Sequence, residues 1–283
     1  MSHAFFWYRH RADIAPSLLV FVIFALQLLA FFTLQNPLEL AGIVALLMLV
    51  QVSCGAVCHN HHHVNIFTRS GANRLIEVVM YLQTGTSPFS WTIHHNIGHH
   101  GDYLDQERDP ARWQEPDGSV MSRIKFDLWN AAMIYPEIWK IGAHHRLLFS
   151  RFKRWFWISN AALLGLLLIN PLNALIVFVI PMVLMLIVLL DNTFQQHSGL
   201  STEDHYLASR NVEHPFYNMT SWNLGYHTAH HMHPGIHWSR LPAIHAKIRH
   251  RIPEVLLSQK LIPDLDHVIP HTLPQPALEP LPD

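Results

Sequence analysis

Charged side chains are scarce in this sequence. Asp, Glu, Lys and Arg make up 14% of its 283 residues, whereas ordinary soluble domains carry about 25%. Half of the residues are hydrophobic and the mean hydropathy is +0.14, so the deficit excludes an ordinary soluble domain and indicates a membrane protein. Because 19 basic and 20 acidic residues nearly cancel, the chain also lacks the basic field that attracts nucleic acid.

Cysteine is almost absent as well. The two thiols, Cys54 and Cys58, stand four residues apart in an apolar run, which is not the spacing of a CxxC zinc or redox motif. Two cysteines also cannot build a disulfide framework. We therefore expect both to be small helix-packing residues near a membrane face.

Four apolar segments lack charge for long enough to cross a bilayer, or nearly so. A spanning helix needs about 20 apolar residues; segments 17–34, 40–58 and 171–190 approach this length, while 155–169 is shorter. Short Asn/Pro turns at 35–37 and 170–173 join the segments in two pairs. These turns predict two transmembrane helical hairpins, with snorkelling side chains at the start of the third span.

Lys and Arg are missing from both turns. They flank the segments elsewhere, and the positive-inside rule then places both termini and the middle region in the cytoplasm. We predict an all-α integral membrane protein with four spans and a cytoplasmic helical cap. It should form a single domain over residues 1–260, followed by a Pro-rich tail over 261–283. The basic residues behind this orientation are Arg9, Arg11, Arg69, Arg74, Arg146, Arg151, Lys153 and Arg154.

Two stretches of the middle region, 75–82 and 124–141, mix apolar and polar residues at helical spacing. Tryptophans in and around this region suit the headgroup level of a membrane. One interpretation is that both stretches are interfacial amphipathic helices. The other is a peripheral core of packed helices, and the pattern alone leaves both open.

Histidine, by contrast, is abundant, with 24 residues. Most of the candidates stand in three runs just beyond apolar segments, on the same predicted side of the membrane. Since residues three or four apart share one face of a helix, each run can direct two or three imidazoles into one space. With one further histidine after the fourth segment, the candidate metal ligands are His59, His63, His95, His99, His100, His197, His227, His230 and His231.

Nine imidazoles are too many for one metal ion. Two ions would take four or five each and leave room for oxygen or water. Imidazole binds zinc, copper, iron and nickel alike, so the ligand type does not select the metal. A structural zinc site is closed by four ligands, usually including Cys, and the excess of histidine therefore predicts an open, reactive pair of metals.

Other polar residues near the runs need a separate interpretation. His61, His62 and His94 lie off the expected faces and should support the site or face solvent. Carboxylates around the second and third runs could accept the N–H of metal-bound imidazoles, although solvated loop charge explains any single one equally well. These carboxylates are Asp102, Asp105, Glu107, Asp109, Glu203, Asp204 and Glu213. His144 and His145 should face headgroups or water, and His233 and His237 could support the third run.

The order HxxxH, HxxxHH, a lone His and HxxHH resembles the membrane fatty-acid desaturase and hydroxylase superfamily. The stretch from His227 to Pro242 is similar to the third histidine box of acyl desaturases, whereas His95 to His100, followed by Glu107-Arg108-Asp109-Pro110, looks more like the alkane ω-hydroxylases. The likeness covers roughly residues 17–245. It implies a non-haem di-iron centre held by the nine histidines, with molecular oxygen as co-substrate and an external electron donor of the ferredoxin, rubredoxin or cytochrome b5 type.

The sequence departs from the acyl desaturases in two places. Their second box is usually HxxHH, but here four positions separate His95 from His99. The family also often places Asn four positions before the lone histidine; that position is Thr193, and Asn192 precedes it. We expect a desaturase that acts on a fatty-acyl or lipid chain, with a lipid or alkane hydroxylase as the alternative.

A metal transporter and a scaffold are the competing interpretations. Transporters place ionisable residues near the bilayer midplane, and the four predicted spans contain no Asp, Glu, Lys, Arg or His. A membrane scaffold with incidental histidines would keep its metal content after replacement of His95 or His230 by Ala. We consider both less consistent with the sequence than an enzyme.

Overall fold

The computed structural model describes residues 7–262, and this part of the chain is helical almost throughout. The predicted Pro-rich tail lies outside the described residues, apart from its first two positions. The α-helices are α1 (Ile14–Thr33), α2 (Pro37–His63), α3 (Ser70–Thr84), α4 (His100–Asp102), α5 (Arg123–Ala143), α6 (Arg146–Ile169), α7 (Pro171–Ala174), α8 (Ile180–His197), α9 (Pro215–Thr220), α10 (His227–Met232) and α11 (Leu241–Ile248).

The remaining elements are short. Two π-helices cover Thr92–His99 and Leu175–Val179, and 3-10 helices cover Arg11–Asp13, Trp238–Arg240, Arg249–Arg251 and Glu254–Leu256. A two-stranded parallel sheet pairs β1 (Asn211–Val212) with β2 (Leu257–Ser258).

Four helical stretches are long and apolar enough to cross a membrane: Arg11–Thr33, Pro37–His63, Arg146–Ile169 and Pro171–His197. They cover the four predicted segments except for Leu34, so the prediction of four apolar helices of membrane length is confirmed. The third is 24 residues long because it begins at Arg146, well before the apolar run. The Asn/Pro turns mark two of the starts: Asn36 and Asn170 each cap a helix with their side chains, and Pro follows at once, where its missing N–H costs no hydrogen bond.

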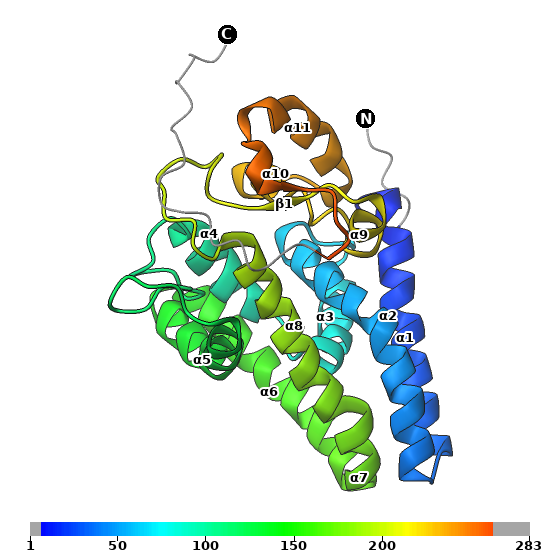
Figure 1. Ribbon diagram of the computed structural model, residues 1–283. Helices are drawn as coiled ribbons and strands as arrows, with labels where there is room; N and C mark the ends of the chain where they lie inside the picture. The colour runs from blue at the N-terminus through cyan, green and yellow to red at the C-terminus, as the bar shows by residue number, and fades with distance from the viewer. Residues whose placement is uncertain (1–6, 263–283) are drawn as a thin grey trace.

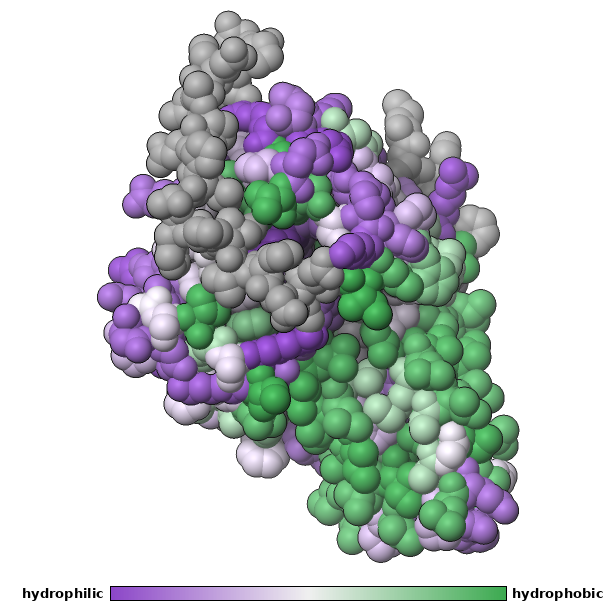
Figure 2. All heavy atoms as spheres, in the orientation of Figure 1, coloured by the Kyte–Doolittle hydropathy of each residue, from purple (hydrophilic) through white to green (hydrophobic). Residues whose placement is uncertain are grey.

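The long helices extend to one end of the molecule, and the short helices α4, α9, α10 and α11 lie at the other (Figure 1). Figure 2 shows that the end reached by α1, α2, α7 and α8 is largely covered by hydrophobic side chains, while the opposite end is hydrophilic. Since α2 ends at His63 and α8 at His197, both carry their histidines toward the hydrophilic end.

Three fully buried glutamines join α1, α2 and α3. The amide of Gln27 donates to Gln51 Oε1 at 3.1 Å, Gln51 donates to the Gln83 carbonyl at 2.7 Å, and Gln83 donates to the Val20 carbonyl at 3.0 Å. Unpaired amides would cost several kcal/mol in hydrocarbon, so this ladder favours one register of the three helices.

The two mixed stretches of the middle region behave differently. Helix α3, which holds 75–82, buries most of its side chains among α1, α2 and α8, as expected of a packed helix. Helix α5, which holds 124–141, buries Phe126, Ile134 and Ile138 but exposes Ile124 and Leu128. The packed interpretation therefore applies to α3, and α5 keeps an exposed apolar face.

Candidate metal centre

The first histidine run occupies the last turn of α2. His59 and His63 are one turn apart, their ring centroids are 4.9 Å apart, and both point into the interior of the hydrophilic end. The intervening His61 and His62 turn away. His61 Nε2 lies 3.0 Å from Glu77 Oε1, and His62 Nδ1 donates to the Cys58 carbonyl at 2.8 Å. These two are buried support rather than solvent-facing residues.

The second run lies on the π-helix Thr92–His99 and passes into α4 at His100. A π-helix hydrogen-bonds five residues ahead, so His95 and His100, five apart, turn to one side, and their Nε2 atoms are 3.1 Å apart. The rings of His95 and His99 stack with centroids 5.1 Å apart, so the two residues do lie on one side of the helix, yet His99 contributes to a different group. The ring of Trp91 stacks on His95 at 4.7 Å.

Gly98 lets this π-helix approach the loop that follows it. A Cβ at this position would lie 2.7 Å from Pro110 Cγ and 2.9 Å from Ile141 Cδ1. The close approach brings Asp109 to the box, where its carboxylate accepts from His99 Nδ1 at 2.9 Å.

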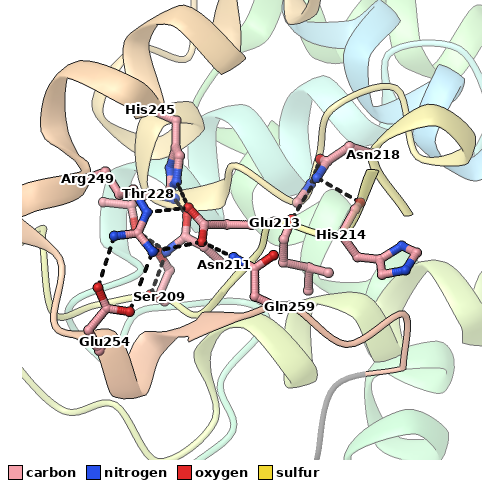
Figure 3. A network of polar contacts seen from close by, with 12 residues as sticks. Ser209, Asn211, Glu213, His214, Asn218, Thr228, His245, Arg249, Glu254 and Gln259 are labelled. Carbon is pink, nitrogen blue, oxygen red and sulfur yellow. Dashed lines mark hydrogen bonds and ion pairs between the residues drawn. The ribbon is translucent and has the colours of Figure 1, made fainter. Parts of the chain in front are cut away.

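The third run forms α10, and a polar network fixes its start (Figure 3). Asn211 accepts from the backbone N–H of Thr228 at 3.0 Å and donates to its hydroxyl at 2.8 Å. Ser209 lies 2.9 Å from the same hydroxyl. Because all three side chains are buried, they hold the first turn of α10 and hence the direction of its imidazoles.

The nine candidate histidines meet in two adjoining groups. In the first group, ligand nitrogens of His59, His63, His95, His100 and His230 lie within 4.8 Å of one another. In the second, those of His99, His197 and His231 do the same. His227 completes the second group, with its Nε2 2.9 Å from that of His197 and 3.0 Å from that of His231. The second and third histidine runs therefore each contribute ligands to both groups.

The second group has the donor chemistry of a cation site. His197 Nδ1 donates to the Ala208 carbonyl at 2.8 Å, so its Nε2 carries a lone pair in the neutral ring. That lone pair faces the Nε2 atoms of His227 and His231 at 2.9 and 3.1 Å. A metal–imidazole bond of about 2.1 Å places two ligand nitrogens at right angles about 3 Å apart, which matches this spacing.

Unpartnered nitrogens give the same result for both groups. The Nε2 atoms of His59, His63 and His99 are buried without a hydrogen-bond partner. Buried nitrogens are normally satisfied, and one metal ion in each group would satisfy all three, His59 and His63 in the first group and His99 in the second. The residues present therefore fit a pair of metals.

Burial keeps the imidazoles neutral. Desolvation, followed by repulsion from neighbouring histidines, holds the pKa of His95, His100, His230 and His231 well below the usual 6.5. At neutral pH these rings offer lone pairs rather than protons. Asp109 is the opposite case: burial alone would raise its pKa, but the His99 ring and the hydrogen bonds it receives lower it, so it remains a carboxylate that accepts from His99.

Asp109 is the one predicted carboxylate that the described structure places on a box histidine. Glu213 instead pairs with His245 and Arg249, as Figure 3 shows, and Asp102 and Asp105 pair with Arg108 near the surface. For these three the other interpretation, loop charge away from the imidazoles of the two groups, applies, because local cations hold them.

Some supporting groups gave no signal in the sequence. Glu77 on α3 bonds His61, although α3 carries no histidine. The Ala208 carbonyl fixes His197, and no side-chain pattern reports a carbonyl. Tyr103 is buried with its ring 4.2 Å from that of His231, and its hydroxyl lies 2.5 Å from His205 Nδ1.

The remaining histidines that we singled out lie outside both groups. His94 is buried, and His144, His145 and His233 are exposed. His237 Nε2 lies 2.9 Å from Asp13 Oδ1, so it ties the region after α10 to the start of α1.

A cavity of about 560 Å³ lies between α2 and α8, beside α9, and reaches the first group at His59 and His95. Most of its lining is apolar, including Leu49, Val52 and Leu189.

Thr193 stands four positions before His197, where acyl desaturases often have Asn, and Asn192 precedes it. Both residues also line the cavity. The Asn192 amide donates to the Val188 carbonyl at 2.9 Å and accepts from the Tyr217 hydroxyl at 3.3 Å. Its described partners are therefore not histidines.

Comparison with known proteins agrees with this site. A family model described as fatty acid desaturase matches residues 35–261, which include all nine histidines of the two groups. No curated protein matches the chain.

Proposed function

The chain belongs to the fatty acid desaturase family, and from that premise we propose that it is an oxygen-dependent di-iron desaturase of a fatty-acyl or lipid chain. The family makes it a membrane oxidoreductase. The finer assignment rests on one observation: two groups of five and four imidazoles adjoin each other, and the first of them borders an apolar cavity. No simple binding role needs nine converging imidazoles beside a space suited to an alkyl chain.

The ligands divide between two irons as the two groups do. His59, His63, His95, His100 and His230 would hold one ion, and His99, His197, His227 and His231 the other. Bound iron supplies the activation of molecular oxygen that removes hydrogen from an unactivated C–H bond. Overall, the alkyl chain of the substrate loses two hydrogen atoms and gains a double bond. One molecule of oxygen takes up these two hydrogens, two electrons from the donor and two protons, and becomes two waters.

The protein's own residues position the substrate. Leu49, Val50 and Val52 line the cavity on one side and are exposed on α2, a helix of membrane length. An alkyl chain would therefore enter from the hydrocarbon between α2 and α8. His59, His95 and Trp91 form the wall that it meets, and the apolar lining excludes water from the reacting carbon.

The reaction needs two electrons, and the described part of the protein contains no group that would supply them. We propose an external electron donor of the ferredoxin, rubredoxin or cytochrome b5 type. We also propose that both termini and the metal centre face the cytoplasm, since the cations at the start of α6 and the histidine ends of α2 and α8 lie on the same side of the spans.

Hydroxylation is the second candidate, and the second box favours it. The π-helix that separates His95 from His99 carries the HxxxHH spacing that resembles alkane hydroxylases. Both reactions begin with the same hydrogen removal; hydroxylation ends with transfer of one oxygen to the carbon.

Lipid profiling distinguishes these functions. Cells with and without the protein would be compared by mass spectrometry, with His230→Ala as the inactive control and His144→Ala as the matched surface control. A new double bond in one class of chain is expected. An added oxygen would indicate hydroxylase instead. Metal flux into vesicles with no lipid product would overturn the assignment as an enzyme.

A further inference from the structure

The corner between α5 and α6 combines two features that the proposed reaction does not use. One is the exposed apolar face of α5. The other is a cluster of cations in the first turns of α6. From their combination we propose that this corner, residues 123–157, binds anionic phospholipid headgroups at the membrane surface.

Helix α5 has two apolar faces. Phe126, Ile134 and Ile138 are buried against the protein, whereas Ile124 and Leu128 on another side are 73% and 59% exposed. Trp129 and Trp139 are also exposed. A helix in water would carry polar residues on its outer face, and an apolar face with tryptophans is typical of a helix lying in the membrane interface.

The cations occupy the outward face of α6. Arg146, Arg151, Lys153 and Arg154 are all exposed, and at about 100° per residue they fall within half of the helix circumference, opposite buried Phe152. In the described part of the chain none of the four makes an ion pair with a carboxylate. On α5 the nearby Glu137 is already paired with Lys140. The corner therefore carries net positive charge that a phosphate can neutralise.

The corner is rigid beneath these cations. The Phe149 ring lies so close to Gly142 that a Cβ there would come within 2.5 Å of it. Trp139 meets Phe149 and Phe152 edge-on, with centroids 5.6 and 5.0 Å apart. This aromatic cluster packs the first turns of α6 against the end of α5. It therefore sets the position of the α6 cations relative to the exposed apolar face of α5.

Continuity with the spans identifies the lipid bilayer as the occupant. Helix α6 is itself of membrane length, and Leu147 at its start is 84% exposed. Figure 1 shows α5 beside the half of α8 nearer the histidine end, not at the far tip of the spans. The apolar face of α5 therefore continues onto a membrane helix, with the cations at headgroup height. A polybasic segment in this position attracts anionic lipid.

Electron paramagnetic resonance of spin-labelled lipids tests this directly. The purified protein would be placed in phosphatidylcholine nanodiscs that contain labelled phosphatidylglycerol or labelled phosphatidylcholine, and the immobilised fractions would be compared. We expect Arg151→Gln/Arg154→Gln to lower the preference for phosphatidylglycerol by at least about threefold. The matched control, Arg240→Gln/Lys247→Gln, removes the same charge from the region of α11 and should leave the preference unchanged.

A second measurement follows the apolar face. A fluorophore on Leu128→Cys should be quenched by nitroxide-labelled lipids, and one on Asp117→Cys should not; the buried native thiols Cys54 and Cys58 should not compete for the label. Equal loss of lipid preference in both double variants, or no loss in either, would overturn the proposal. Two other results would also overturn it. One is a Leu128→Cys label that is shielded by a second copy of the protein, seen as a change in oligomeric state. The other is a cation variant that is reduced more slowly by the electron donor while its lipid preference is unchanged.

Discussion

The two histidine groups differ in what surrounds them. The first has five members and borders the apolar cavity through His59 and His95. The second has four, and hydrogen bonds from outside the group hold two of them, His99 by Asp109 and His197 by the Ala208 carbonyl. The difference suggests a division of tasks, in which the first group faces the substrate and the second depends on fixed outer partners.

Removal of one ligand from each group should have the largest effect. His197→Ala leaves three histidines in the second group, while His63→Ala leaves four in the first. We expect both variants to lose turnover by at least about 100-fold, with iron falling to about one per chain for His197→Ala and staying closer to two for His63→Ala. Iron analysis of the purified proteins, with His144→Ala as control, measures this. Equal iron loss would contradict the difference in ligand number.

Asp109→Asn should have the next largest effect. The amide keeps the shape of the side chain but removes the charge that accepts from His99, and loss of such an outer partner typically costs about 10- to 100-fold in metal affinity or activity. Titration with an iron chelator should therefore strip this variant first. Asp102→Asn is the matched control, since the ion pair of Asp102 among the described residues is with Arg108 near the surface. If the two variants release iron at the same chelator concentration, the role of Asp109 is refuted.

A change in the cavity should affect the first group without loss of metal. Gly55 lines the cavity, and a Cβ there would meet Leu189 Cδ1 at 3.6 Å. Gly55→Leu should lower turnover of long chains by about tenfold relative to short ones, with iron content unchanged. A Cβ at Gly42 on the same helix would meet nothing within 4 Å, so Gly42→Leu serves as control. An identical chain-length profile in both variants would show that the cavity does not hold the substrate.

Tyr103→Phe should have the smallest effect. The ring against His231 is retained, and only the hydrogen bond to His205 is lost, which typically contributes about 1 kcal/mol. We expect a small decrease in thermal stability and full retention of iron, measured by calorimetry and metal analysis. Loss of iron on a scale comparable to Asp109→Asn would mean that the second group depends on Tyr103 as well.

Much of this arrangement follows from the sequence, and the exceptions have physical reasons. The four spans follow from hydropathy, because a bilayer requires long apolar helices. The direction of each histidine run into one space follows from helical spacing, with His63 and His197 at the ends of two spans and the other two runs on short helices. The distribution of ligands between the groups does not, because the π-helix at Thr92–His99 sets His100 beside His95 and leaves the stacked His99 to the other group. No local pattern in the sequence marks that change in hydrogen bonding.

Long-range partners were equally hidden. Asp109 and Glu213 are both acidic residues near a histidine run, yet one holds His99 and the other is engaged by Arg249. Helices α3 and α5 have similar mixed patterns, but α3 packs among α1, α2 and α8, where Gln83 joins the ladder with Gln27 and Gln51. In each case the outcome depends on residues far along the chain.

The glutamine ladder also constrains how the protein is made. Gln27 and Gln51 lie within the first two spans, and each is costly to leave unpaired in hydrocarbon. Both are synthesised before Gln83, which belongs to a helix that is not itself of membrane length. During biosynthesis α1 and α2 can therefore share the hydrogen bond between Gln27 and Gln51 from the start, whereas the Gln51 amide gains its acceptor only when α3 arrives, and the Gln27 amide its second acceptor, the Val177 carbonyl, later still.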